Sequence, residues 1–168
     1  RRLMATAARK GPQPRLAGWR ESLRKATKRT GSLIAGAAIT VGAILLLVAL
    51  ANYRPSDPAL NTSAAGPVKN WIGEPGAIAS DLLLSLWGPP IGLLLPVLLV
   101  IGLRLVRGAD AGRWLRALLV ALIGVTLIGT AVALLVGGAV NGLPARWGGT
   151  FGLSLAMLVE RGIAQIGQ

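Results

Sequence analysis

The sequence contains no cysteine and no histidine. It can therefore form no disulfide, no thiol nucleophile, no imidazole base and no Cys/His metal site. Acidic residues are scarce as well, because six Asp and Glu stand against eighteen Lys and Arg, giving a formal net charge of +12. Only 14% of the residues are charged, compared with about a quarter in soluble domains. The deficit of charge indicates a bilayer rather than a water-facing surface.

A nucleotide-binding loop is also absent. A Walker A loop needs Gly-x-x-x-x-Gly-Lys-Ser/Thr, whose backbone N–H groups and lysine hold the phosphates. None of the four lysines stands in that pattern; they are Lys10, Lys25, Lys28 and Lys69. We therefore predict no catalytic residue, no cofactor-binding residue and no metal ligand in this chain, and we expect that it is not an enzyme.

Long uncharged runs are present instead, at residues 30–53, 82–103 and 117–145. A helix of about 20 apolar residues crosses a hydrocarbon core of roughly 30 Å. We predict an all-α, polytopic membrane domain in which three helices span the bilayer. The predicted spans are about 32–52, 90–106 and 115–138.

Shorter helices are predicted to lie at the membrane surface, at about 16–29, 77–87 and 150–166. Gly88-Pro89-Pro90 separates the second of these from the span that follows, because proline interrupts the hydrogen bonds of a helix. Gly73-x-x-Gly76 and Gly149-x-x-Gly152 each precede a short apolar helix. This weak internal echo suggests a repeated hairpin.

Residues 1–29 form a basic tail that holds ten of the eighteen Lys and Arg. The helical spacing within 16–29 predicts an amphipathic helix lying on an anionic leaflet. Its lipid-facing basic residues are predicted to be Arg20, Arg24, Lys25, Lys28 and Arg29. A tail whose charges only fix the orientation of the spans would show the same pattern.

Orientation follows from the distribution of Lys and Arg. Four of them lie in 104–116, and two lie in each of 53–76 and 139–168. Since basic loops remain in the cytoplasm, we predict a cytoplasmic N-terminus and a cytoplasmic loop at 104–116. It follows that the loop at 53–76 and the region 139–168 lie on the outer side of the membrane.

Small residues lie at helical spacing within the first and third spans. Such residues let two membrane helices approach closely. The candidate packing residues are Gly36, Gly42, Gly129, Ala133 and Gly137. Their presence is equally compatible with the general abundance of Gly and Ala in membrane helices.

A short motif follows the first span, and a second one precedes the next. The signature residues are Tyr53, Pro55, Ser56, Asp57, Pro58, Gly76 and Asp81. With the basic tail, they make residues 30–168 similar to the N-terminal membrane region of FtsK/SpoIIIE-type DNA translocases. Pro55 and Pro58 restrict φ, and Ser56 or Asp57 can cap a turn, so we expect this segment to order the outer loop as a docking surface.

The resemblance implies four spans that anchor the protein in the bacterial inner membrane at the division septum. Here the membrane domain, 30–168, is expected to stop before the fourth span. By resemblance, a hexameric motor that uses ATP and Mg would pump DNA, and it is absent from this segment. Implied partners are membrane lipids, division-site membrane proteins and further copies of the chain, with DNA bound through the motor. We expect a membrane anchor with a septal-targeting role in cell division and chromosome segregation.

Two alternatives come from other classes of protein. The first is a small polytopic membrane protein whose basic tail binds anionic lipid or nucleic acid. The second is a transporter subunit, which is disfavoured because the span interiors hold few polar residues: Thr40, Thr126 and Thr130. A cation site formed by Asp57, Glu74 and Asp81 on one side of the membrane is a weaker interpretation than solvated loop charges.

Overall fold

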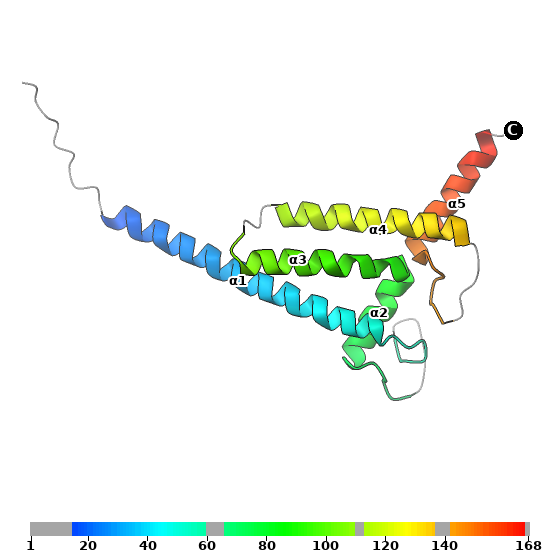
Figure 1. Ribbon diagram of the computed structural model, residues 1–168, viewed down its shortest axis with the longest axis horizontal. Helices are drawn as coiled ribbons and strands as arrows, with labels where there is room; N and C mark the ends of the chain where they lie inside the picture. The colour runs from blue at the N-terminus through cyan, green and yellow to red at the C-terminus, as the bar shows by residue number, and fades with distance from the viewer. Residues whose placement is uncertain (1–14, 60–65, 110–112, 137–141, 167–168) are drawn as a thin grey trace, which may run out of the picture.

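The computed structural model describes residues 15–59, 66–109, 113–136 and 142–166 (Figure 1). Its elements are all helices: α1 (Arg15–Ala51), α2 (Glu74–Trp87), the 3-10 helix η1 (Pro89–Leu93), α3 (Leu94–Val106), α4 (Trp114–Val136) and α5 (Gly149–Ile166). Three are long and apolar enough to cross a membrane, at Gly18–Ala51, Pro89–Val106 and Trp114–Val136. The predicted all-α membrane fold with three spans is confirmed.

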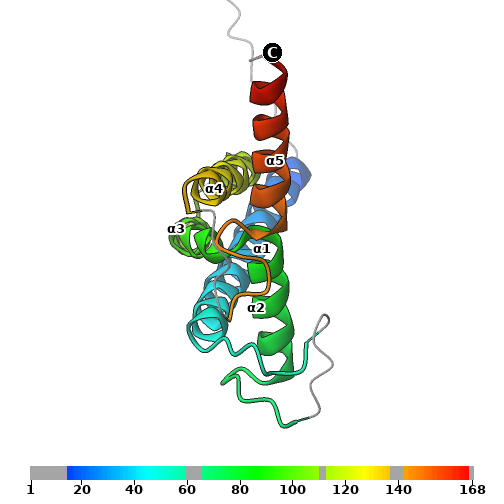
Figure 2. The ribbon, with the colours of Figure 1, turned by 90° about the vertical axis from the view of Figure 1, so that its right-hand side faces the viewer.

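The three spans lie side by side, with α3 between α1 and α4 (Figure 1). Helices α2 and α5 run across one end of this bundle, roughly in line with each other (Figure 2). We call this end the Tyr53 end, because residues 52–59 also lie there. The opposite end, which carries the end of α3 and the start of α4, is called the Arg104 end.

Helix α1 corrects one boundary of the prediction. The surface helix predicted at 16–29 and the span predicted at 32–52 form a single helix of 37 residues, about 55 Å long at 1.5 Å per residue. Gly31 does not interrupt it, because one glycine inside a helix costs only about 1 kcal/mol. The basic segment therefore continues along the axis of the span instead of turning onto the leaflet as a separate helix.

The predicted break before the second span is confirmed. Gly88 ends α2 with φ +67°, and Pro89 and Pro90 begin η1, which leads directly into α3. The first turn of a helix has no intrahelical partners for its N–H groups, so prolines are tolerated there.

A compact apolar cluster joins α4 to the Tyr53 end. Leu84, Ile91, Leu94 and Val125 form its buried centre. Trp87 packs against this cluster and donates a hydrogen bond from Nε1 to Thr126 Oγ1 at 3.1 Å. Its ring also contacts that of Phe151 in a tilted arrangement, with ring centroids 5.0 Å apart. The tie through Trp87 fixes α2, α4 and the start of α5 to one another.

Helices α1 and α3 make the most extensive contact in the molecule, where Gly36 faces Gly102. A methyl group at Gly36 would lie 2.6 Å from the backbone N of Val106 and 2.8 Å from the carbonyl O of Gly102. One at Gly102 would collide with Thr40. Ser32 Oγ also donates to the Leu105 carbonyl at 2.9 Å. Since lipid tails are as apolar as leucine, such backbone proximity supplies the attraction between membrane helices.

The close contact predicted at Gly42 is not formed within the described chain. A methyl group there would meet no atom within 4 Å. Six residues turn a helix by about 600°, so Gly42 lies on a different face from Gly36. The face of Gly36 continues instead through Ala43, seven residues later and only 2% exposed.

Helix α4 uses Gly129 to approach the start of α5. A methyl group at Gly129 would lie 2.9 Å from the carbonyl O of Gly148, and one at Gly152 would lie 2.7 Å from the backbone of Gly129. Ala133 borders the same contact at Gly148. Gly137 lies outside the described residues.

We expect Gly36→Leu to destabilise the bundle and Gly42→Leu to leave it nearly unchanged. Backbone atoms of α3 block a side chain at Gly36, and overpacking of this kind costs about 1–3 kcal/mol. Gly42→Leu serves as the matched control because it makes the same change on the same helix in open space. The free energy of unfolding, measured by detergent titration of helical circular dichroism, checks this. Equal stability of the two variants would contradict the contact.

Candidate functional site

The sequence-predicted signature gathers at the Tyr53 end, where the chain leaves α1. Tyr53 is half-buried, and its hydroxyl donates a hydrogen bond to Asp81 Oδ1 on α2 at 3.2 Å. Asp81 is only 3% exposed. Two signature residues separated by 28 positions therefore form one contact that ties the end of α1 to α2.

Asp57 orders the loop around it. Its backbone N–H donates to the Arg54 carbonyl at 3.1 Å, which closes a turn. Its carboxylate, 4% exposed, accepts a hydrogen bond from the backbone N–H of Lys69 at 3.1 Å. Asp57 thus links the segment that follows α1 to the segment that precedes α2. Pro55 and Ser56 remain exposed, and Pro58 is half-buried.

Asn70 belongs to the same cluster, although no motif in the sequence marks it. Its side-chain Nδ2 donates to the Ala49 carbonyl at 3.0 Å, and its Oδ1 accepts from the Ile72 N–H at 3.0 Å. The residue is 5% exposed. An asparagine in a polar loop is usually exposed, so only the three-dimensional contact identifies its role.

Gly76 lies directly against this cluster. A methyl group at Gly76 would lie 2.5 Å from Ile72 Cβ and 2.6 Å from Asn70 Oδ1. One turn later Ser80, fully buried, donates to the Gly76 carbonyl at 2.7 Å. The absence of a side chain at Gly76 is what lets the loop pack onto the first turn of α2.

The environment of Tyr53 changes its acidity. Burial, followed by the charge of Asp81 and the hydrogen bond to it and then by the charge of Asp57, raises the pKa of Tyr53 from 10.0 to about 12. Both carboxylates therefore disfavour the phenolate beside them. Because folding raises the pKa, the neutral phenol of Tyr53 favours the folded state over the unfolded one. Its contribution to the free energy of unfolding is complete below pH 10 and is lost as the pH rises through about 12.

The Tyr53 cluster, defined as Tyr53, Asp57, Asn70, Gly76 and Asp81, holds a loop shape and presents no catalytic arrangement. Among the described residues, no group of three His, Cys, Asp or Glu side chains is placed to hold a metal ion. The cluster instead positions an exposed rim formed by Arg54, Pro55, Ser56 and Trp71, and Trp71 is 77% exposed. Such a rim offers contacts to another molecule.

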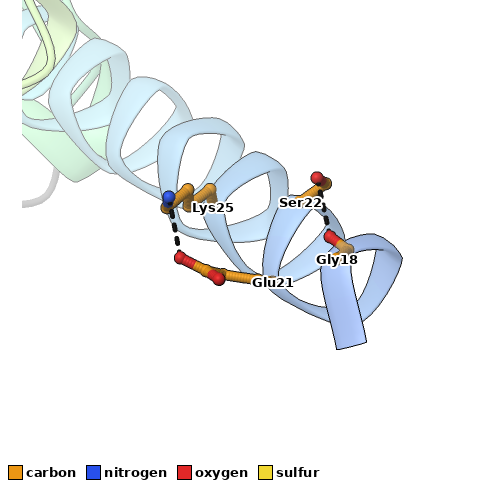
Figure 3. Close-up of polar contacts among 4 residues, drawn as sticks. All are labelled: Gly18, Glu21, Ser22 and Lys25. Carbon is orange, nitrogen blue, oxygen red and sulfur yellow. Dashed lines mark hydrogen bonds and ion pairs between the residues drawn. The ribbon is translucent and has the colours of Figure 1, made fainter. Parts of the chain in front are cut away.

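The predicted lipid-facing basic residues lie exposed on the first half of α1; they are Arg20, Arg24, Lys25, Lys28 and Arg29. Figure 3 shows Lys25 Nζ paired with Glu21 Oε1 at 2.9 Å, beside the hydrogen bond from Ser22 to Gly18. An exposed pair at this spacing stabilises a helix by only a few tenths of a kcal/mol. The role of these charges in lipid binding remains a prediction.

Comparison with known proteins identifies the family. Residues 28–168 match the family described as the 4TM region of DNA translocase FtsK/SpoIIIE. The chain belongs to this family. The match includes the whole Tyr53 cluster and all three spans from residue 28 onward, so the resemblance predicted from the signature residues is confirmed. This FtsK/SpoIIIE segment is the membrane domain and not the motor.

A curated relative supports the same assignment. DNA translocase FtsK from Caulobacter vibrioides is 40% identical over 80 residues, which are 45% of this chain and 9% of that protein. The matched part is thus a small fraction of the relative's length. No solved structure matches this FtsK/SpoIIIE membrane domain.

We expect the single tyrosine of the chain to titrate near pH 12 when its absorbance is followed at 295 nm. Asp81→Asn removes one charge that disfavours the phenolate, so it lowers the pKa, while burial keeps the value above 10. Glu74→Gln, an exposed acid on the same helix, is the control and leaves the titration unchanged. A wild-type transition at pH 10 would rule out the buried contact.

Asp57→Ala should expose the Lys69–Asn70 peptide bond to trypsin, because the N–H of Lys69 loses its acceptor. Trypsin cleaves poorly after Arg54, which precedes a proline, so cleavage after Lys69 reports on this loop. Loss of a hydrogen bond to a charged group costs about 1.5–3 kcal/mol, so cleavage should accelerate at least about tenfold. Ser56→Ala, one residue away and exposed, is the control. Identical cleavage rates in the two variants would show that Asp57 does not hold the loop.

Proposed function

We propose that this domain anchors a DNA translocase in the bacterial inner membrane and directs it to the division septum. The observation that carries the proposal is the match of residues 28–168 to the membrane region of FtsK/SpoIIIE. Three apolar helices supply the anchor. Energy conversion, with ATP, Mg and DNA as its ligands, belongs in this proposal to a motor outside the segment.

The charge distribution supports a cytoplasmic N-terminus. Arg104, Arg107, Arg113 and Arg116 all lie at one end of the bundle, and the basic first half of α1 extends past this same end (Figure 1). The Tyr53 end carries Arg54 and Lys69 as its basic residues from the 53–76 loop. Because basic loops remain on the cytoplasmic side, the Tyr53 cluster then faces the outside of the inner membrane.

The Tyr53 cluster suits docking to a division-site membrane protein. Its buried hydrogen bonds fix the loop before any partner arrives, and a pre-ordered loop loses less conformational entropy on binding. The exposed Trp71 and the rim at Arg54, Pro55 and Ser56 provide an aromatic and polar surface of the kind enriched at interfaces. Assembly of several copies around one motor would multiply this contact.

Localisation in dividing bacteria tests the proposal. The domain, fused at its N-terminus to a fluorescent protein that matures in the cytoplasm, should form a band at midcell. Scrambling Tyr53–Pro58 should abolish the band while the protein remains in the membrane fraction. A matched control scrambles the exposed tail segment 18–24 and should leave the band intact.

An even signal around the whole cell would contradict septal targeting by this domain. Loss of fluorescence from the membrane in the scrambled variant would show instead that the segment is needed for insertion. The match to the family and the anchoring function would stand in the first case, because they do not depend on position within the cell.

A further inference from the structure

A groove of about 930 Å³ separates α3 from α4 at the Arg104 end. It exists because α4 is held at the other end, where Trp87 bonds to Thr126 and Gly129 packs on α5. Over its whole length α3 contacts α1 far more extensively than it contacts α4, and α4 contacts the short η1 almost as much as it contacts all of α3. The two walls thus diverge, and we call the opening the α3–α4 groove.

The walls of this groove are apolar and its mouth is basic. Apolar lining comes from Pro96, Val97, Val100, Ile101, Ala117 and Val120. Three arginines line the same groove: Arg104, Arg113 and Arg116. Each is exposed. A spanning helix places such side chains where the hydrocarbon core meets the headgroups.

The spacing of residues along α3 and α4 places the arginines nearer the membrane surface than the apolar side chains of the groove. On α3, Arg104 follows Val100 and Val97 by four and seven residues, which is one and two helical turns. On α4, Arg116 precedes Val120 by four residues, and Arg113 lies just before the helix begins at Trp114. At 1.5 Å per residue, Arg104 and Arg116 lie about 6–10 Å nearer the membrane surface than the valines on their own helix faces.

No acidic side chain lines the α3–α4 groove among the described residues, and the one ion pair found in that part of the chain is Lys25 with Glu21. Three arginines at one site make the mouth of the groove cationic, and a cationic mouth attracts an anion. Arginine binds phosphate through two parallel N–H donors, which makes it well suited to this role.

We propose that the α3–α4 groove is a binding site for an anionic diacyl phospholipid. The lipid phosphate is held by Arg104, Arg113 and Arg116. One acyl chain lies along the wall formed by Val97, Val100 and Val120. Basic pockets between membrane helices bind anionic headgroups in this manner. A soluble polyanion such as DNA would satisfy the arginines but leave the apolar wall uncovered, so the lipid fits better.

A neighbouring groove supports this assignment. It has a volume of about 880 Å³ and carries Lys28, Arg29 and Arg107. Trp114 lines both grooves. Indole rings concentrate at the boundary between headgroups and hydrocarbon, so Trp114 places the surrounding cations at the level of lipid phosphates. The inference requires only that the domain spans a bilayer, and it does not depend on septal targeting.

Native mass spectrometry of the purified domain tests the site. The domain is reconstituted in vesicles of equal amounts of phosphatidylglycerol and phosphatidylcholine and extracted in mild detergent, and the retained lipids are counted. The wild type should retain phosphatidylglycerol over phosphatidylcholine by at least about tenfold. Combined R104Q, R113Q and R116Q should lower this preference at least fivefold.

A matched variant removes three charges elsewhere, through R54Q, R146Q and R161Q, all at exposed positions outside both grooves and outside the basic tail. It should retain the wild-type preference. Val120→Trp leaves every arginine in place but fills the apolar wall, so it should also lower retention. Helical circular dichroism confirms that each variant is folded, and Val120→Trp provides a second test if the arginine variant is not.

Three results would overturn the proposal. Equal loss in both charge variants would mean that net charge alone attracts the lipid. Unchanged retention of phosphatidylglycerol in Val120→Trp would show that no acyl chain lies in the groove. Displacement of the retained lipid by 10 mM glycerol phosphate would show that the site recognises a free phosphate instead of a membrane lipid.

Discussion

The close approach of α1 and α3 at Gly36 and Gly102 fixes the direction in which α1 runs toward the Tyr53 end. In a bilayer no hydrophobic effect drives two helices together, so their attraction depends on how near their backbones come. Two glycines facing each other allow this approach. With the two helices fixed, the last turn of α1 lies where the Ala49 carbonyl meets Asn70 and where Tyr53 meets Asp81.

The two ends of the bundle are built on different physical principles. At the Tyr53 end, buried side chains hold the loop through specific hydrogen bonds, and small residues let loops and helix ends approach closely. Asp57 Oδ2, Asp81 Oδ2 and Ser85 Oγ are buried there without a hydrogen-bond partner among the described residues. Such a surface is rigid before it meets a partner, as docking requires. At the Arg104 end, α3 and α4 diverge, and the arginines lie beside open apolar grooves. This end is suited to the lipid itself, which fills irregular space and supplies negative charge.

Much of the fold could be predicted because membrane spans are encoded locally. Uncharged runs predicted the three spans, and Gly88-Pro89-Pro90 predicted the break between α2 and η1. The continuity of α1 through Gly31 was missed, because the change from basic to apolar composition suggested a boundary that the backbone does not have. Hydrogen bonding continues through a glycine, and composition alone does not show this.

The candidate site was predictable only in part, for reasons that individual residues make clear. Family resemblance pointed to Tyr53, Asp57, Gly76 and Asp81, which the structure places in or beside one cluster. Asn70 escaped notice because its partner, the Ala49 carbonyl, is 21 residues away and carries no side-chain signal. Gly42 was chosen by residue type, although its direction on α1 points away from every neighbour in the described chain.

The most direct test of this account is the side of the membrane on which each end of the bundle lies. The chain has no cysteine, so single cysteines can be introduced by Ser56→Cys at the Tyr53 end and Arg107→Cys at the Arg104 end, both at exposed positions. A membrane-impermeant maleimide should label Cys at 56 in bacterial cells with a permeabilised outer membrane, and should label Cys at 107 only after the inner membrane is opened. Labelling of both from one side, or in the reverse order, would contradict the proposed arrangement of the spans.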